Sequence, residues 1–219
     1  MTPDCVAAQI DAVFDDVQIS AVKIGMLHDA GIIHAVADRL TRYRPKWIVL
    51  DPVMIAKSGA PLLEPAAIHA LKAQLLPLST VITPNLPEAA TLLETSAAES
   101  DAAIHAQLNR LLRLGPQAVL IKGGHSNDPA HSTDWLLEAD NAHDQLKSFT
   151  SQRICTRNDH GTGCTLSSAI AALLPQNTLT SAIRHAKAYL QAALEASDRI
   201  SVGSGHGPLH HFHNLWPAR

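Results

Sequence analysis

Three short aliphatic runs, each followed by polar or glycine residues, constrain the fold of this chain most strongly. They are residues 47–53 (WIVLDPV), 80–84 (TVITP) and 118–124 (AVLIKGG). Strands that are apolar on both faces and alternate with helical segments are typical of a parallel sheet covered by helices. Ligands of such sheets gather beyond the carboxyl ends of the strands. The sequence therefore predicts an α/β fold with a site at that edge of the sheet.

The segments between these runs complete the predicted layers. A further strand is expected at residues 20–27, and the alternating pattern of residues 133–154 suits an antiparallel hairpin at a sheet edge. Apolar residues spaced three to four apart predict a first helix over residues 4–14, with Asp4 as its N-cap. Helices are also expected over residues 28–42 and 66–75, in a segment that begins after Asn85, and over residues 101–114, 165–174 and 180–200. Residues 1–219 contain no internal repeat and no long linker, so a single domain with a mixed, mostly parallel sheet is expected.

A glycine-containing loop, residues 158–164 (NDHGTGC), leads directly into the small-residue helix predicted at 165–174. The unpaired N–H groups and the dipole of a helix start favour an anion, and Gly161 and Gly163 would let a phosphate approach the backbone. Cys164 falls in the first turn, where a thiol is readily deprotonated and could act as nucleophile or proton acceptor. Alternatively, the glycines only form a tight loop and Cys164 is a small buried apolar residue.

Two charged residues close predicted strands. Asp51 ends an aliphatic run, where its carboxylate could hold magnesium or orient a hydroxyl group, or could only cap a turn. Lys122 could reach a phosphate or only extend to solvent along an apolar surface. Gly123 and Gly124, which follow it, would leave room for a bulky ligand.

Asn85 and Glu88 lie at the crossing from a strand to a helix. Their spacing of three is that of a capping box, which is the favoured interpretation of these two residues on their own. In the functional interpretation, Glu88 carries magnesium and its water shell beside a polyphosphate. Both interpretations are compatible, because a cap residue can also face a site.

Three other residues are weaker candidates. Lys187, on the last long helix, has a solvent-facing role as its favoured alternative. Met26 and Val53 stand at apolar strand ends and could line a flat ligand, although core packing is the default for each.

Together these residues place acids, a lysine and a glycine loop at one edge of one sheet. That layout suits phosphoryl transfer, which needs a metal, cationic and N–H donors for the moving charge, and a base for the acceptor. The sequence has neither a Walker P-loop pattern nor G-x-G-x-x-G, so a nucleotide site would be of another kind.

Composition excludes several other classes of protein. A formal net charge of −3 offers no basic stripe, so no nucleic-acid partner is expected. No apolar run is long enough for a membrane span and the first residues do not resemble a signal peptide, so no membrane partner is expected. Three widely spaced cysteines suit a reducing compartment and hence the cytoplasm. The histidines of the C-terminal tail lack the spacing of metal ligands, and a packed or solvated tail is expected there.

Several motifs together resemble the hydroxymethylpyrimidine/phosphomethylpyrimidine kinases of thiamine biosynthesis, within the ribokinase-like superfamily. They are VKIGML, VLDPVMIAKSGAPLL, ITPNLPEAATLL, VLIKGGH, NDHGTGCTLSSAIAALL and the tail GHGPLHHFH, and they cover essentially the whole chain. The resemblance implies a three-layer α/β/α fold and a kinase that uses ATP and Mg²⁺. Its substrates would be 4-amino-5-hydroxymethyl-2-methylpyrimidine and the monophosphate of that pyrimidine, and a homodimer is expected.

The resemblance also implies roles for individual residues. Gly161, Thr162, Gly163 and Cys164 look like the anion hole, with Cys164 where sugar kinases of the superfamily carry a catalytic aspartate. The remaining implied roles are magnesium for Asp51 and Glu88, phosphate for Asn85 and Lys122 with Gly123, the nucleotide side for Lys187, and the walls of the pyrimidine pocket for Met26 and Val53.

The chain departs from the family pattern at its start. Family members begin with a strand and a glycine-rich segment, then a strand bearing a glutamine that reads the pyrimidine, and this sequence contains neither. Bare strand edges would follow, so a less stable, association-prone protein is expected. The alternatives to the kinase are a non-catalytic remnant that still binds nucleotide, a pyridoxal kinase-like activity, and a cysteine hydrolase that uses Cys164 with His160.

Overall fold

The structure is a computed structural model that describes residues 1–54, 62–126, 128–139 and 145–216. Within these residues, six strands form one sheet in the order β1-β2-β3-β4-β5-β6. The strands are β1 (Ala21–Ile24), β2 (Trp47–Leu50), β3 (Val81–Ile82), β4 (Ala118–Ile121), β5 (His131–Glu138) and β6 (Lys147–Gln152). Strands β1 to β4 run parallel, and β5 and β6 follow as an antiparallel hairpin. The predicted mixed sheet with a hairpin at its edge is confirmed.

The register of the parallel strands brings their carboxyl ends level. Leu50 of β2 pairs with Ile82 of β3, and Ile82 pairs with Val119 of β4. Beyond these pairs, Asn85 and Lys122 form an isolated parallel bridge. The residues that follow β2, β3 and β4 therefore lie side by side at one edge of the sheet.

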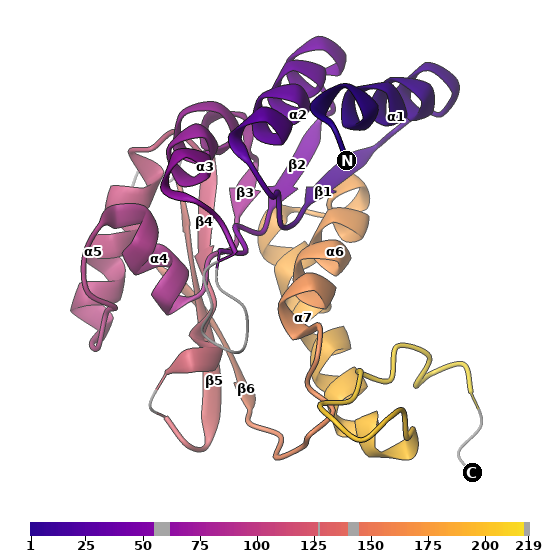
Figure 1. The fold of residues 1–219 in the computed structure, drawn as a ribbon. Coiled ribbons are helices and arrows are strands. Elements are labelled where there is room, and N and C mark those ends of the chain that lie inside the picture. Colours follow the sequence, from indigo (N-terminus) through magenta and orange to yellow (C-terminus); the bar gives the residue numbers. More distant parts are fainter. Residues whose placement is uncertain (55–61, 127, 140–144, 217–219) are drawn as a thin grey trace.

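Helices cover both faces of the sheet, which gives three layers (Figure 1). One face packs against α2 (Ala30–Tyr43), α3 (Pro65–Ala70), α4 (Leu86–Leu93) and α5 (Asp101–Leu112), and the other against α6 (Thr162–Leu173) and α7 (Leu179–Glu195). The first helix, α1 (Pro3–Asp16), packs on α2.

Alternation along the buried strands explains why their sequences are apolar throughout. In β2, Leu50 belongs to the core under α2 to α5, whereas Val49 belongs to the core under α6 and α7. In β4, Ile121 and Leu120 divide in the same way. Each strand thus buries both of its faces, as expected for a parallel sheet between two helical layers.

Some predicted boundaries were wrong, for local reasons. The first helix begins at Pro3 and not at Asp4, because Thr2 is the N-cap and accepts a hydrogen bond from the Cys5 N–H (3.3 Å). Helix α6 begins at Thr162, three residues before the prediction, since the positive φ of Gly161 (85°) lets that glycine end the loop.

Other elements are shorter than predicted or change their helical type. Strand β2 ends at Leu50, because the Val53 N–H turns back to the Asp51 carbonyl (2.8 Å). Helix α3 continues as a π-helix over Leu71–Leu75 and a 3₁₀ turn over Leu76–Leu78. Helix α7 ends at Glu195 and is followed by a 3₁₀ turn over Ser197–Arg199. None of the described helices is long and apolar enough to cross a membrane.

Candidate functional site

The start of helix α6 lies at the carboxyl edge of the sheet and has the features of an anion site. Gly161 is its N-cap, and the first intrahelical bond runs from the Thr165 N–H to the Gly161 carbonyl (2.8 Å). Among the described residues no side chain caps this helix start, so its first-turn N–H groups are open to an anion. Cys164 is exposed in this first turn. The alternative of a buried, apolar Cys164 is wrong.

Asp51, Glu88 and Lys122 form a compact charged cluster beside that helix start. The Lys122 Nζ lies 2.5 Å from Asp51 Oδ1 and 3.8 Å from Glu88 Oε2. Both acids are almost fully buried, with 1% of Asp51 and 3% of Glu88 exposed. One ammonium group thus faces two carboxylates, and Lys122 does not extend freely to solvent.

Asp51 is held by two hydroxyl groups that sequence reasoning missed. The Thr83 hydroxyl donates to Asp51 Oδ1 (3.1 Å), and the Ser167 hydroxyl lies 3.2 Å from Asp51 Oδ2. Ser167 belongs to α6 and is also within reach of the carbonyl oxygens of Gly163 and Cys164. No local signal singles out Ser167 in the sequence, because α6 also contains Thr162, Thr165 and Ser168.

Gly163 is the point at which the helix start and the charged cluster meet. A Cβ atom at this position would lie 3.4 Å from Lys122 Nζ and 3.7 Å from Asp51 Oδ2. Residues far apart in the sequence therefore meet at one edge of the sheet. Asp51 is hydrogen-bonded to Lys122, 71 positions away, and to Ser167, 116 positions away. A ligand bound at the first turn of α6 would contact the ammonium of Lys122.

Asn85 and Glu88 form the predicted capping box of α4. The Asn85 N–H donates to Glu88 Oε2 (2.7 Å), and the Glu88 N–H donates to Asn85 Oδ1 (2.8 Å). Burial raises the pKa of Glu88 above its usual value, and the nearby Lys122 opposes this shift. Both interpretations hold geometrically, because the capping carboxylate also faces Lys122.

Lys187 is buried, so the solvent-facing alternative is wrong. Its Nζ lies 2.6 Å from Asp134 Oδ2, and only 9% of the lysine side chain is exposed. The other oxygen of Asp134 accepts a hydrogen bond from the Gly123 N–H (2.9 Å). Asp134, which the sequence analysis did not single out, therefore links Lys187 to the turn after Lys122.

Met26 and Val53 occupy different environments near the same edge. Met26 follows β1 and is 49% exposed, whereas Val53 is half-buried. The core position in this region is taken by Met54, which is 2% exposed. The quoted loop MIAKSGAPLLEP continues through residues 55–61, which lie outside the described residues.

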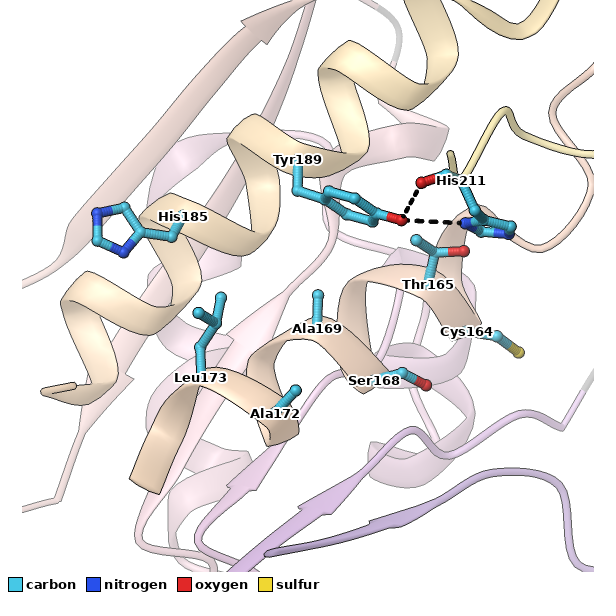
Figure 2. A pocket seen from close by; sticks show the side chains of 9 residues that line it. All are labelled: Cys164, Thr165, Ser168, Ala169, Ala172, Leu173, His185, Tyr189 and His211. Carbon is cyan, nitrogen blue, oxygen red and sulfur yellow. Dashed lines mark hydrogen bonds between the residues drawn. The ribbon is translucent and has the colours of Figure 1, made fainter. Parts of the chain in front are cut away.

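A groove of about 710 Å³ runs between α6 and α7 and ends at Cys164 (Figure 2). Its wall is mostly apolar, and Tyr189 lies across it with its hydroxyl donating to the His211 carbonyl (2.9 Å).

His211 belongs to the C-terminal tail, which packs back on the glycine loop through a hydrogen bond from the His160 N–H to the Gly207 carbonyl (3.1 Å). Among the residues that the structure describes, no group of three or more His, Cys, Asp or Glu side chains could hold a metal. A packed or solvated tail was predicted, and the tail is packed at His210 (4% exposed) and solvated at Phe212 (50% exposed).

Comparisons with known proteins find similar sequences among phosphomethylpyrimidine kinases. A sequence profile of the family described as Phosphomethylpyrimidine kinase matches residues 1–210. The hydroxymethylpyrimidine/phosphomethylpyrimidine kinases of Salmonella typhimurium and Escherichia coli are each 50% identical to this chain, over 98% of this chain and 79% of each relative.

Solved structures agree with these sequence relatives. A phosphomethylpyrimidine kinase from Clostridium difficile has a TM-score of 0.76 at 36% identity and covers 89% of this chain, with 77% of that protein covered. The ADP complex of Bacillus subtilis pyridoxal kinase has a TM-score of 0.85 at 30% identity, over 98% of this chain and 78% of that protein. Both sequence and fold thus relate this chain to small-molecule kinases.

Proposed function

Because this chain belongs to the phosphomethylpyrimidine kinase family, we propose that it phosphorylates 4-amino-5-hydroxymethyl-2-methylpyrimidine and then the resulting monophosphate, with ATP as the donor. The product would enter thiamine diphosphate biosynthesis. The observation that carries this proposal is the edge at which Lys122, Asp51 and the first turn of α6 meet. Phosphoryl transfer depends on positioning and on donors for the moving charge, and this edge offers both.

The phosphate chain of ATP would lie between Lys122 and the start of α6. The N–H groups of residues 161–164, among them Thr162 and Gly163, would donate to the transferred phosphoryl group. Lys122, next to Gly123, would supply a positive charge on the opposite side. The side-chain amide nitrogen (Nδ2) of Asn85 is not used by the capping box, so it would also donate to a phosphate oxygen. Lys187 would act on the nucleotide side of the site.

Asp51 and Glu88 would hold Mg²⁺. The chemistry of the donors fits this ion, because Mg²⁺ prefers one or two carboxylates completed by water and substrate phosphates. The fit also agrees with their placement, since both carboxylates already face one cation, the Lys122 ammonium. When bound, Mg²⁺ would neutralise charge on the phosphate oxygens. In our proposal Glu88 keeps its capping bond to the Asn85 N–H while its carboxylate faces the metal.

Cys164, as the thiolate, would accept the proton of the substrate hydroxyl group and become a thiol. Its thiol is exposed at the helix start, next to the N–H groups that would hold the phosphoryl group. Met26 and Val53 would form walls for the flat aminopyrimidine ring, which an exposed apolar side chain beside the site can cover.

Turnover by these 219 residues tests the proposal directly. We expect ATP-dependent phosphate transfer to the hydroxymethyl substrate and a loss of about 100-fold or more in kcat for Cys164→Ala, with ATP affinity retained. Full activity of Cys164→Ala would overturn the role of the thiol. Nucleotide binding by the wild type without any turnover would overturn the kinase proposal in favour of a non-catalytic nucleotide-binding protein.

Pyridoxal is a second candidate substrate. The pyridoxal kinases of Bacillus subtilis and Staphylococcus aureus, the latter solved with AMP-PCP, share this fold at TM-scores of 0.85 and 0.86. Competition between the aminopyrimidine and pyridoxal in one assay separates the two activities. We expect a higher kcat/KM for the aminopyrimidine, and a higher value for pyridoxal would reverse the assignment.

We also propose that residues 1–219 act as one domain in a cytoplasmic homodimer without a nucleic-acid or membrane partner. The near-neutral charge and the three free cysteines support this setting. Sedimentation analysis of the purified chain would measure the assembly, and a monomer at all concentrations would contradict the homodimer.

A further inference from the structure

We propose that Asp134 is a positioning residue, which ties helix α7 to the backbone of the turn after Lys122 and thereby fixes where the Lys122 ammonium lies. The inference rests on the proposed function, in which that ammonium contacts the phosphate chain. Asp134 lies on β5, outside the groups that would touch the substrates.

The two oxygens of Asp134 have separate partners on separate elements. Oδ1 accepts the Gly123 N–H at 2.9 Å, and Oδ2 pairs with Lys187 Nζ at 2.6 Å. One carboxylate thus joins β5, α7 and the turn that follows β4. The contact with Oδ1 satisfies the Gly123 N–H.

The pair of Asp134 and Lys187 is buried, which restricts its geometry. Only 6% of the Asp134 side chain and 9% of the Lys187 side chain are exposed. A buried charge is tolerated only when it is paired and hydrogen-bonded, and its geometry is then well defined. The position of the carboxylate is therefore set by Lys187, and the position of Gly123 is set by the carboxylate.

Two further contacts restrict the same turn. A Cβ atom at Gly123 would collide with the Thr133 carbonyl, so the turn lies directly against β5. Arg153, at the end of β6, donates to the carbonyl oxygens of Gly124 (2.8 Å), Ser126 (3.0 Å) and Asp128 (2.6 Å). The Gly123 turn is consequently held from inside by Asp134 and from outside by Arg153.

Lys122 is directly bonded to this restrained turn. Its own N–H donates to the carbonyl of Pro84, which follows β3 (2.8 Å), so its backbone is fixed on one side by Pro84 and on the other by Gly123. Its side chain then reaches Asp51 and Glu88. Loss of the Asp134 bond would release one side of this backbone and widen the range of positions of the ammonium.

A matched pair of double variants isolates the bond to Gly123. Asp134→Leu with Lys187→Met removes both charges and the acceptor, whereas Asp134→Asn with Lys187→Met removes the charges and keeps an oxygen for the Gly123 N–H. Replacing a buried ion pair by apolar residues of similar volume commonly preserves the fold. Since Lys187→Met is common to both variants, any direct effect of Lys187 on the nucleotide cancels in the comparison.

Two readouts follow the proposal. Amide hydrogen exchange in the ligand-free protein measures protection of Gly123, and steady-state kinetics measures kcat and the KM for ATP. We expect the leucine variant to lose Gly123 protection and to lose about 10- to 100-fold in kcat/KM for ATP relative to the asparagine variant, as misplacement of a charged group predicts. Equal exchange and equal kinetics in the two variants would overturn the proposal.

Glu138→Gln is the control for a general effect of the hairpin. Glu138 also joins the hairpin to α7, through Lys147 (2.6 Å) and the neighbouring Thr180, but it pairs with Ala118, at the end of β4 away from Gly123. We expect wild-type protection of Gly123 and wild-type kinetics in this control. A loss as large as that of the leucine variant would mean that any hairpin contact has the same effect, and would overturn the specific role of Asp134.

Two further outcomes remain decisive. If the leucine variant does not fold, wild-type exchange decides, because Gly123 must be protected like Leu120 of β4, and exchange at the unprotected rate would overturn the proposal. If the wild type shows no kinase activity, the proposed function fails, whereas the exchange comparison still supports or overturns the restraint on the turn.

Discussion

At the scale of single residues, the two glycines of the loop, Gly161 and Gly163, look alike in the sequence but have different structural roles. Gly161 has a positive φ of 85° and open space where a Cβ would lie, whereas Gly163 faces Lys122 and Asp51 closely. The first glycine is therefore required by its backbone conformation, and the second by the space that it leaves for a ligand.

This difference predicts opposite phenotypes for two alanine variants. Gly161→Ala should lose about 1–2 kcal/mol of unfolding free energy, because an L-residue is strained in the left-handed region. Gly163→Ala should keep its stability, since the flexible end of Lys122 can move by a few tenths of an ångström, but should weaken ATP binding at least tenfold. Chemical denaturation and calorimetric titration measure the two effects. Gly124→Ala, with open space at its Cβ, is the control, and the account would be wrong if it matched Gly163→Ala.

The ionised carboxylate that the proposed site needs at Glu88 lowers the stability of the fold. Burial raises the pKa of Glu88, and Lys122 only opposes this shift. A carboxyl whose pKa is raised on folding contributes stability below its unfolded pKa, and that contribution is lost as the pH rises through the folded pKa. Ionisation of Glu88 is therefore costly to the fold.

Glu88→Gln should accordingly be at least as stable as the wild type at neutral pH, without metal or nucleotide, while kinase activity falls. Glutamine is neutral at every pH and keeps an oxygen for the Asn85 N–H. The difference in unfolding free energy should disappear at acid pH, where Glu88 is protonated. If the variant is less stable than the wild type at neutral pH and as stable as the wild type at acid pH, the raised pKa of Glu88 is contradicted.

At the scale of elements, Tyr43 helps to attach α1 to α2, beside the ion pair of Arg39 with Asp11 (2.8 Å). The Tyr43 hydroxyl lies 2.9 Å from both Asp11 Oδ1 and Asp15 Oδ1, and its ring stacks on Phe14 at 4.5 Å. Desolvation and the two carboxylates raise the pKa of Tyr43 to about 12. The hydrogen bonds of Tyr43 to α1 thus depend on a protonated phenol.

The attachment of α1 should therefore weaken at high pH. The stability that Tyr43 contributes is present below its unfolded pKa of 10.0 and is lost as the pH rises through about 12. Ultraviolet titration of Tyr189→Phe, in which Tyr43 is the remaining tyrosine of the chain, should give a midpoint near 12. A midpoint near 10 would show that the contacts to α1 do not form in solution.

Element types were predictable from the sequence, whereas their ends depended on local backbone chemistry. The aliphatic runs became β2, β3 and β4 because each strand packs between two helical layers. Helix α6 could not be bounded, since Gly161 caps it through a positive φ and without a side chain. Likewise, Thr2 displaced Asp4 as the cap of α1 because Pro3 is already suited to a first helical position.

The site was predictable only in part, for reasons of distance in the sequence. Asp51, Glu88 and Lys122 follow apolar runs, so their shared edge could be inferred from strand order. Asp134 pairs with Lys187 from 53 positions away, and no local pattern indicates such a partner. Lys187 therefore looked like a solvent-facing charge, although the structure buries it.

At the scale of the whole molecule, the site joins elements from both ends of the chain. Helix α6 packs against β1 and β2, and Ser167 links it to Asp51. A nucleotide that bridges Lys122 and α6 should therefore stabilise the sheet and both helical layers together.

Ligand-linked stability should follow from this arrangement. At an ATP concentration of 100 times its Kd with excess Mg²⁺, the unfolding free energy should rise by about 2.7 kcal/mol. Removal of Mg²⁺ with EDTA should reverse most of this gain if Asp51 and Glu88 hold the ion. Thermal denaturation with and without each component measures the effect, and an equal gain without Mg²⁺ would contradict the proposed metal site.

A crystal structure of this chain with Mg²⁺ and a non-hydrolysable ATP analogue tests the central claim most directly. We predict the terminal phosphate at the N–H groups of residues 161–164, within hydrogen-bonding distance of Lys122 and on the side of Asp51 and Glu88. An analogue bound with its phosphates away from the first turn of α6, or with Lys122 still paired only to the two acids, would contradict the account.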